Sequence, residues 1–322
     1  MPPSQCRSSM RDMSNVFSRI LVGVDDSDVS SEAVAFATRL AAEHGGRLII
    51  CNSVNWLPVV TQIASSGAII DPTPAVDDLK AEGEALLDRA MEIAERGGVI
   101  AQRVALEGEP ALNLLEQAAE RKCSLIVMGT HGRQGAERLF AGSTTEAVLR
   151  GSAIPVLTVR AGTTIAAPGK RCFETIVAGV DESEPSNAAI HTILDLPAED
   201  RRHVIFYSVA GAREDEADQA HRVVGKAVGL ANARGISAKG RVIAGHPDEA
   251  LIASAQQQGA DLIVLGSHGR HGLHRLFLGS VAEGVVRKSP LPVLVVRTRE
   301  DVPVPERIPA GARTAVPEPS HA

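Results

Sequence analysis

The chain has 322 residues, of which 44% are hydrophobic and 2% aromatic, and its formal charge is −6. This length suits two domains, and an aliphatic core suits helices packed on a parallel sheet. The negative charge and the lack of clustered basic and aromatic residues argue against a nucleic-acid-binding surface. The four cysteines lack paired spacing, which indicates reduced thiols, with Cys51 and Cys123 as core residues. No apolar run approaches the roughly 18 residues that span a bilayer, so we expect a cytoplasmic protein with no membrane partner.

The first part of the chain alternates between strand and helix patterns. Residues 1–15 are polar and predict a disordered tail. Helical periodicity follows at Ser30–His44 and Leu79–Arg96, whereas Asn55–Asp77, which holds Pro58, Pro72 and Pro74, predicts irregular chain. Short β-rich runs predict strands at Ile20–Val24, Leu48–Ser53, Ile100–Leu106, Leu125–Met128 and Val156–Val159.

The second part repeats the same order of patterns. Residues 161–172, rich in Gly, Ala and Thr, predict a linker, and the Pro-rich residues 298–322 predict a disordered tail. Strands are predicted at Ile176–Val180, Val204–Val209, Ala238–Ile243, Leu262–Leu265 and Val293–Val296. Strands that alternate with helices predict right-handed crossovers and a parallel sheet covered on both faces.

Direct sequence similarity supports this repeat. Arg19-Ile-Leu-Val-Gly-Val-Asp25 returns as Thr175-Ile-Val-Ala-Gly-Val-Asp181, and the segment from Gly129 to Arg160 aligns without a gap with the segment from Gly266 to Arg297. The intervening spacing is longer in the first copy, so that copy carries an insertion after its second strand. Gly108-Glu-Pro110 and Gly245-His-Pro247 also correspond, and each predicts a helix start with proline in the first turn.

Each copy also contains a glycine-rich loop between a predicted strand and a predicted helix. The motif is G-x-x-G, nine residues and G-S, first from Gly129 to Ser143 and again from Gly266 to Ser280. Glycines allow the backbone to approach a ligand closely, and a helix N-terminus offers unpaired N–H groups and a positive dipole end to phosphate. The loops therefore predict phosphate binding.

With these motifs the sequence resembles the universal stress protein family, in its tandem form and its ATP-binding branch. The resemblance covers residues 16–160 and 173–297. It implies two tandem Rossmann-like domains of the adenine nucleotide alpha hydrolase-like class. Each would be a five-stranded parallel sheet of order 3-2-1-4-5 with helices on both faces. The ligand would lie between strands one and four, where the strand order reverses.

The resemblance also implies the residues that would contact ATP, with Mg²⁺ bridging the phosphates. Near the adenine and ribose it implies Asp25, Ser53 and Gly129, and in the second copy Asp181, Val209 and Gly266. Near the phosphates it implies Gly132, Arg133, Gly142, Ser143 and Thr144, and in the second copy Gly269, Arg270, Gly279, Ser280 and Val281. Because valine has no hydroxyl, we expect the second site to bind more weakly.

Several of these residues have simpler interpretations. Ser143 with Glu146, like Ser280 with Glu283, has the spacing of a capping box. Asp25 and Asp181 could begin the first turn of a helix, with Ser27 or Asp28 as its cap. The histidines His131 and His268 recur without a nearby partner for catalysis, which favours a loop-shaping role, and the spacing of His268, His271 and His274 only weakly suggests a metal site.

The leading hypothesis is an ATP-binding regulatory protein with two sites per chain and an unidentified protein partner. The alternatives are a slow ATPase or nucleotidyl-transfer enzyme on the same fold, and a nucleotide-independent interaction protein. The last strands, Pro155–Val159 and Pro292–Val296, are aliphatic and would lie at the sheet edges. Because exposed aliphatic edges aggregate, we expect these two strands to pair antiparallel within one chain, as an intramolecular pseudo-dimer that could associate further into a homodimer.

Overall fold

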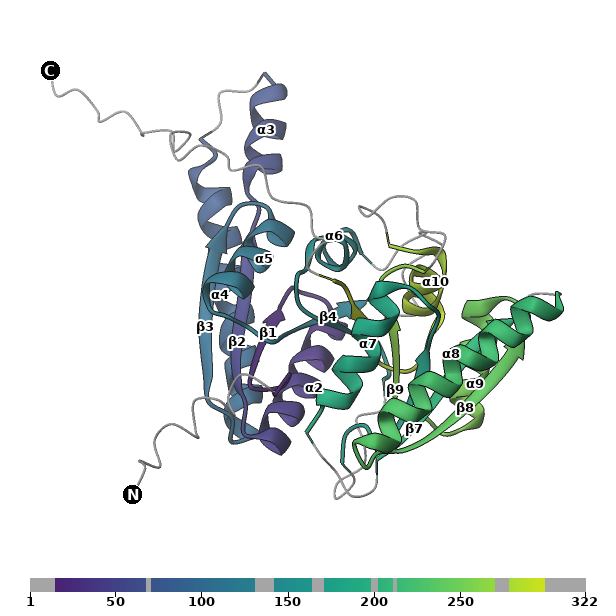
Figure 1. The fold of residues 1–322 in the computed structure, drawn as a ribbon. Helices are drawn as coiled ribbons and strands as arrows, with labels where there is room; N and C mark the ends of the chain where they lie inside the picture. Colours follow the sequence, from purple (N-terminus) through teal and green to yellow (C-terminus); the bar gives the residue numbers. More distant parts are fainter. Residues whose placement is uncertain are drawn as a thin grey trace, which may run out of the picture.

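The computed structural model describes residues 15–67, 71–130, 142–163, 171–197, 202–210, 213–269 and 278–298. The first half contains β1 (Arg19–Gly23), α2 (Asp28–His44), β2 (Arg47–Val54), α3 (Leu57–Ser65), α4 (Thr73–Arg96), β3 (Ala101–Glu107), α5 (Pro110–Glu120), β4 (Leu125–Thr130), α6 (Ser143–Gly151) and β5 (Val156–Arg160). The second half contains β6 (Thr175–Gly179), α7 (Glu184–Asp195), β7 (His203–Ala210), α8 (Glu214–Ala233), β8 (Ser237–Ala244), α9 (Pro247–Gln257), β9 (Leu262–Gly266), α10 (Ser280–Lys288) and β10 (Val293–Val296). Figure 1 shows the two halves side by side.

The strands form one 10-stranded sheet of order β3-β2-β1-β4-β5-β10-β9-β6-β7-β8. Within each half all pairings are parallel and follow the order 3-2-1-4-5, which confirms the predicted fold class. The order reverses between β1 and β4 in the first half and between β6 and β9 in the second. Parallel strands end at the same edge of the sheet, so each reversal leaves a crevice at the carboxyl ends.

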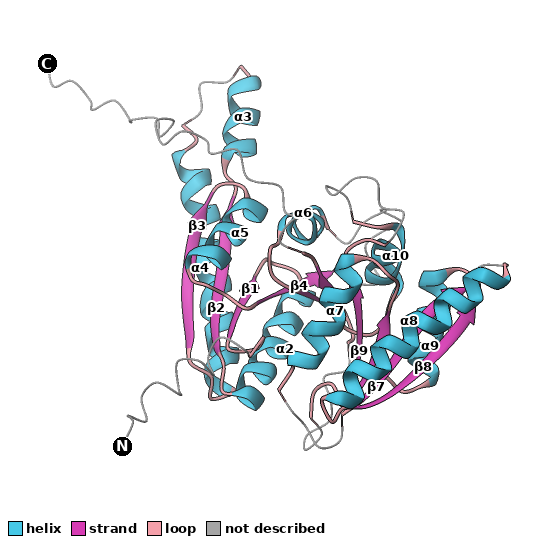
Figure 2. Cartoon of the chain, viewed as in Figure 1, coloured by secondary structure: helices cyan, strands magenta, loops and turns pink. Residues whose placement is uncertain are grey.

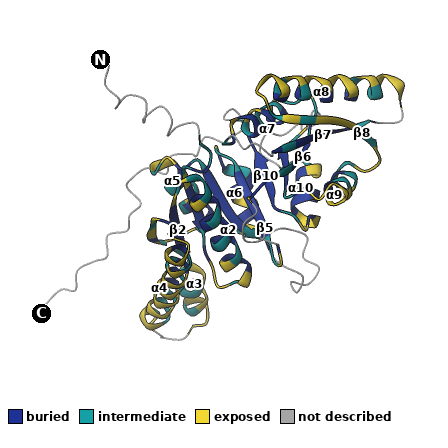
Figure 3. Ribbon diagram, turned by 90° about the horizontal axis from the view of Figure 1, so that it is seen from below, coloured by how far each residue is buried: buried dark blue, intermediate teal, exposed yellow. Residues whose placement is uncertain are grey.

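Helices cover both faces of this sheet (Figure 2). On one face α2, α4, α7 and α8 bury alternate strand residues such as Ile20, Val22 and Leu48. The other face is covered by α5, α6, α9 and α10. These helices bury the intervening strand residues, such as Leu21 and Ile49. The strands are thus apolar on both sides, which explains their continuous aliphatic sequences. Figure 3 shows this buried centre, and the more exposed outer helix α8.

The two halves are joined through their last strands. β5 and β10 pair antiparallel, with Leu157 opposite Leu294, as expected from their aliphatic sequences. A second contact involves Phe173, which precedes β6 and whose ring centroid lies 6.1 Å from that of Phe17 and 5.8 Å from that of Phe36 in the first half. Phe17 and Phe173 are each 2% exposed. Burial of each such ring contributes about 1.5–3 kcal/mol to the stability of the fold. Because Phe173 packs against two rings of the first half, the two halves share one hydrophobic core.

The described ends of the linker are attached to the first half. Gly162 donates its backbone N–H to Glu32, and Cys172 donates its own to Glu43, each across 2.9 Å. Both glutamates lie on α2, so this helix anchors the chain on either side of residues 164–170, which lie outside the described residues.

The insertion in the first half differs from the prediction of irregular chain at Asn55–Asp77. It contains α3 and the beginning of α4, and Pro58 and Pro74 lie in the first turns of these two helices. The prolines therefore start helices, because their missing N–H would have no partner at that position. Helix α3 buries none of its residues and projects from the body of the molecule beside α4 (Figure 1). Pro110 and Pro247 start α5 and α9 as predicted. Among the described helices, none is long and apolar enough to cross a membrane.

Candidate functional site

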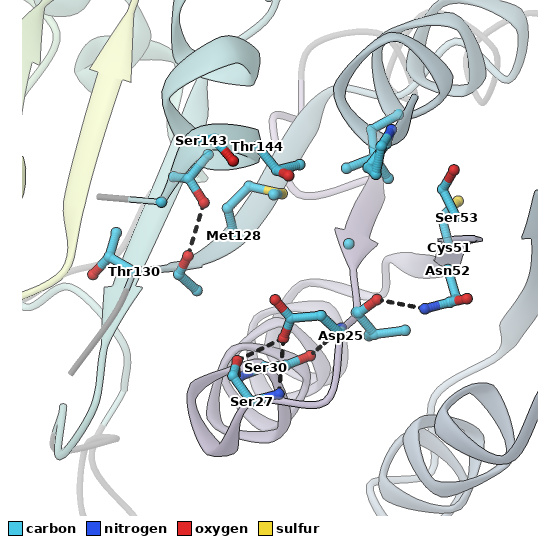
Figure 4. A pocket seen from close by; sticks show the side chains of 17 residues that line it. Asp25, Ser27, Ser30, Cys51, Asn52, Ser53, Met128, Thr130, Ser143 and Thr144 are labelled. Carbon is cyan, nitrogen blue, oxygen red and sulfur yellow. Dashed lines mark hydrogen bonds between the residues drawn. The ribbon is translucent and has the colours of Figure 1, made fainter. Parts of the chain in front are cut away.

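A cavity of about 290 Å³ opens at the crevice of the first half, between the carboxyl ends of β1 and β4. Its walls come from β1, β2 and β4, the starts of α2, α5 and α6, and the turns that lead into them. Figure 4 shows how polar groups from these separate segments converge on one space. The lining residues are Gly23, Val24, Asp25, Ser27, Ser30, Cys51, Asn52, Ser53, Pro110, Leu114, Met128, Gly129, Thr130, Gly142, Ser143, Thr144 and Thr145.

Asp25 lies between β1 and α2 and has a structural role as well as a place in the cavity. Its Oδ1 accepts hydrogen bonds from the backbone N of Ser27 at 3.1 Å and from the Ser27 hydroxyl at 2.6 Å. Ser27 is in turn the N-cap of α2, accepting from the backbone N of Ser30. Asp25 therefore shapes the first turn, as the simpler interpretation predicts. Figure 4 shows its second oxygen outside these bonds and turned toward the cavity.

The neighbouring strand β2 contributes Asn52 and Ser53 to the cavity wall. The Ser53 hydroxyl donates to the carbonyl oxygen of Gly108 at 3.1 Å and accepts from Asn113 Nδ2 at 2.7 Å. Asn52 is 7% exposed and donates from Nδ2 to the carbonyl oxygen of Val24 at 2.9 Å. These bonds fix the two strand ends relative to each other and hold Asn52 and Ser53 rigidly at the cavity wall.

The phosphate end of the predicted site is the start of α6. Gly142 is its N-cap residue, with φ of 91° and ψ of 136°, a conformation that favours glycine. The capping-box interpretation is therefore wrong for Ser143 and Glu146, because serine is already the first helical residue and Glu146 pairs with Arg150 instead. In the second half Gly279 likewise precedes Ser280 and Glu283. The Ser143 hydroxyl is thus not used as a cap, and Ser143 lines the cavity.

Gly129 is the penultimate residue of β4. A Cβ atom at this position would lie 3.0 Å from Val29 Cγ1 and 3.3 Å from the Val29 backbone, so glycine allows α2 to pack closely on the end of the strand. The carbonyl oxygen of Gly129 accepts a hydrogen bond from the Thr145 hydroxyl at 2.9 Å. This bond ties the first turn of α6 to β4 across the loop that connects them.

Of the eight residues expected to contact nucleotide in the first half, the cavity brings together six, namely Asp25, Ser53, Gly129, Gly142, Ser143 and Thr144. The other two, Gly132 and Arg133, lie outside the described residues, as do Arg270, His131, His271 and His274. His268 is described, and its Nδ1 lies 3.1 Å from the Ser267 hydroxyl, a contact that fits a loop-shaping role.

The second half has the same framework. Asp181 Oδ1 accepts from the backbone N of Ser183 at 2.9 Å and from the Ser183 hydroxyl, just as Asp25 accepts from Ser27. Val209 is on β7, Gly266 ends β9, and Ser280 and Val281 begin α10. At Gly266 a Cβ atom would lie 2.6 Å from the Pro185 carbonyl carbon. Gly269 packs closely against Asp181: a Cβ atom at this position would lie only 2.7 Å from Asp181 Oδ2.

Cys51 lies in the cavity wall, yet its thiol is not activated. Burial raises its pKa to about 12, with the neighbouring Cys123 contributing further. The side chain is 0% exposed. A thiol with so high a pKa is almost entirely protonated at neutral pH and is a poor nucleophile. Cys51 is therefore a packing residue of the core.

Five polar residues of the cavity were not among those expected to contact nucleotide: Ser27, Ser30, Asn52, Thr130 and Thr145. Asn52 directly precedes Ser53 in a strand otherwise rich in aliphatic residues, and a polar amide in such a run is a signal of function. Thr145 follows Thr144, and its bond to Gly129 depends on a contact between distant segments. Within the described residues no group of three His, Cys, Asp or Glu could hold a metal ion.

Comparisons with known proteins agree with this architecture. Residues 17–160 and 173–297 each match the model of the Universal stress protein family. The universal stress protein YxiE of Bacillus subtilis is 36% identical over 149 residues, which are 45% of this chain and 100% of that protein. A universal stress protein of Mycolicibacterium smegmatis is 27% identical over 300 residues, covering 87% of this chain and 97% of the relative. The crystal structure of a universal stress protein from Archaeoglobus fulgidus superposes with a TM-score of 0.71 at 21% identity, covering 89% of this chain and 99% of that one.

Proposed function

Because the chain belongs to the universal stress protein family, we propose that it is a regulatory protein that binds an adenine nucleotide, preferentially ATP, in the cavity of its first half. One observation carries this proposal: the cavity joins a strand-end carboxylate, Asp25, to the N-terminus of α6. Such a space offers hydrogen-bond acceptors to a nucleoside at one end and donors to phosphate at the other.

The nucleoside end is formed by β1 and β2. The Asp25 carboxylate is an acceptor suited to ribose hydroxyls, because its geometry is fixed by the bonds from Ser27. Leu114 and Met128 add apolar surface to the same cavity, as a heterocyclic base requires. Binding here is favoured by rigidity, since the surrounding hydrogen bonds already hold Asn52 and Ser53 in position.

The phosphate end is formed by the Gly142-Ser143-Thr144 segment. The first turn of a helix leaves N–H groups without intrahelical partners, and the helix dipole adds a partial positive charge. The Ser143 and Thr144 side chains supply hydroxyl donors in the same wall. Mg²⁺ would enter with the nucleotide, held mainly by its phosphates, because the described residues include no carboxylate cluster for it.

The lining residues support binding more than rapid turnover. Among the described residues that line the cavity, Asp25 is the single carboxylate and is already hydrogen-bonded to Ser27, and none is a histidine. Fast hydrolysis would need a base aimed at an attacking water. We therefore propose that the nucleotide changes the shape or partner affinity of the protein, with hydrolysis slow at most.

The test is to purify the protein, denature it and identify any released nucleotide by mass spectrometry. Equilibrium dialysis of nucleotide-free protein against ATP, ADP, AMP and cyclic AMP, with and without Mg²⁺, then ranks the ligands. The double variant Ser143→Ala, Thr144→Ala should bind ATP more weakly while AMP is affected less, because the substitutions lie at the phosphate end. Folded protein that carries no nucleotide and binds none of the four at millimolar concentration would overturn the proposal.

A further inference from the structure

The two halves share a framework, but the residues at their crevices differ in chemistry. β2 and β7 occupy equivalent places, because Cys51 is the register partner of Gly23 and Tyr207 is the register partner of Gly179. Equivalent hydrogen bonds also join these strands: the backbone N of Val24 donates to the carbonyl oxygen of Cys51, and that of Val180 to the carbonyl oxygen of Tyr207, each at 2.8 Å. Residues can therefore be compared one by one between the halves.

This comparison shows that the second half has lost polar groups at its crevice. Ser53, which bonds to Asn113 and Gly108, corresponds to Val209. At the start of the last helix, Thr144 and Thr145 correspond to Val281 and Ala282. The further replacements are Asn113 by Ala250 and Asn52 by Ser208. Four of these five positions therefore have no hydroxyl or amide group in the second half. At the fifth, the shorter polar side chain of Ser208 replaces that of Asn52.

The second half also has a larger side chain in the wall. Cys51 lines the first cavity together with Leu114, and its counterpart Tyr207 is 3% exposed in the cluster that contains Leu251, the counterpart of Leu114. A phenol ring is much larger than a thiol group. Tyr207 therefore fills space at the base of the second crevice that remains open in the first.

The described residues that directly follow β9 contact the turn that holds Asp181. Gly269 lies against Asp181 Oδ2, and Ser183 Oγ, which donates its hydrogen to Asp181 Oδ1, also lies 3.3 Å from the carbonyl oxygen of His268. The backbone N of Gly279 donates to the carbonyl oxygen of Ser267 at 2.8 Å, and Gly279 has φ of −66° where Gly142 has 91°. Asp181 Oδ2 thus lies beside the backbone of Gly269.

We propose that the chain binds one nucleotide, in the first half, and that the second half is a structural copy that binds none. This inference rests on the proposed function. The hydrogen bonds that Asp181 accepts from Ser183 then explain why this carboxylate is retained as a structural residue. The two halves of one shared sheet are therefore specialised, one for ligand and one for support.

Isothermal titration of nucleotide-free protein with ATP and Mg²⁺ should give one site per chain. A stoichiometry of two would overturn the inference while leaving the proposed function intact, and a stoichiometry of zero would overturn both. The outcomes of this one titration therefore separate the two proposals.

Matched substitutions then test which half binds. Asp25→Ala and Asp181→Ala remove the same hydrogen bonds from the equivalent serine, so they should lower Tm by similar amounts. Asp25→Ala should raise the Kd for ATP about ten-fold or more, since it removes a charged hydrogen-bonding group from the site, whereas Asp181→Ala should leave it within about two-fold. A larger effect from Asp181→Ala would contradict the assignment.

A second pair avoids the helix caps. Ser53→Val introduces the residue of the second half into the first and should weaken ATP binding, while Val209→Ser should neither change the Kd nor create a second site. If Asp25→Ala does not fold, this pair still decides the matter. Stronger loss from Val209→Ser than from Ser53→Val would overturn the inference.

Discussion

Leu157 on β5 and Leu294 on β10 are register partners in the antiparallel pair that joins the two halves, and their side chains are 1% and 2% exposed. Each half would otherwise end in an unpaired aliphatic edge strand. The pairing removes both edges at once. It also makes the chain a single ten-stranded unit.

This register can be tested by disulfide formation. In a background where Cys6 is replaced by Ser, Leu157→Cys with Leu294→Cys should form an intramolecular disulfide on mild oxidation. Register partners in antiparallel strands have Cα atoms about 4.5–5.5 Å apart, within the range of a disulfide. The measurement is mobility on a non-reducing gel, with the crosslinked peptide identified by mass spectrometry.

The matched control is Leu157→Cys with Val295→Cys. Val295 pairs with Val156, so its side chain lies on the opposite face of the sheet from that of Leu157. This pair should stay reduced under the same conditions. Equal crosslinking in both double variants would contradict the register.

Thiol labelling tests the packing of the core cysteines. Burial raises the pKa of Cys51 to about 12, of Cys123 to about 11 and of Cys172 to about 12. At pH 8 these thiols are protonated and shielded, so iodoacetamide should leave all three unmodified in the native protein and alkylate them after denaturation. Rapid alkylation of Cys51 in folded protein, detected by peptide mass spectrometry, would show that the cavity wall opens.

Thr145 should stabilise the start of α6. Thr145→Val retains the shape of the side chain but leaves the Gly129 carbonyl oxygen without this donor, and we expect a loss of about 1–3 kcal/mol in the free energy of unfolding. Thr145→Ser keeps the hydroxyl and should cost roughly 0.8 kcal/mol for the missing methyl group. Urea denaturation measures both changes.

Thr61 provides the control, because its hydroxyl makes a bond of similar length, 2.8 Å to Leu57, on the exposed helix α3. Thr61→Val should change the free energy of unfolding by no more than about 0.5 kcal/mol. The interpretation of Thr145 fails if Thr145→Val is as mild as this control.

Trp56, the one tryptophan in the sequence, reports on the base of the insertion. Its Nε1 donates to Glu107 Oε2 at 3.0 Å, and Lys80 Nζ lies 2.9 Å from Glu107 Oε1. Hydrogen bonds from Lys80 and then Trp56 lower the pKa of Glu107 below its usual 4.5. The contacts should therefore persist above pH 4.5 and be lost as the pH falls through the lower folded-state value. Because these side chains are largely exposed, the associated stability is small.

The expected result is a steady Trp56 emission spectrum from pH 7 to 5 and a change below pH 4.5. Glu107→Gln should remove most of this pH dependence, since the amide does not titrate in this range. Circular dichroism at each pH separates the local change from acid unfolding. An identical pH profile in wild type and Glu107→Gln would assign the change to another group.

The repeated strand and helix patterns of this sequence were sufficient to predict both halves, because apolar periodicity is local and each buried strand carries its own signal. The motifs shared by the two copies also located Asp25, Gly142 and Ser143, and the family resemblance added Thr144; the structure brings all four to one cavity. The edge strands were predicted to pair because two aliphatic edges are most simply covered by each other.

Other features depended on contacts between residues distant in sequence. The helices of the insertion were missed because proline marks both loops and helix starts, and local sequence alone did not distinguish them. Thr145 joins α6 to β4 through its hydrogen bond to Gly129, and Asn52 joins β2 to the end of β1 through its hydrogen bond to Val24. Neither bond can be predicted from local sequence. The contact between Gly269 and Asp181 was likewise outside the reach of motif comparison. Both copies keep the aspartate, the glycines and the serine, whereas Gly269 contacts Asp181 only once β6 and β9 lie side by side in the folded sheet.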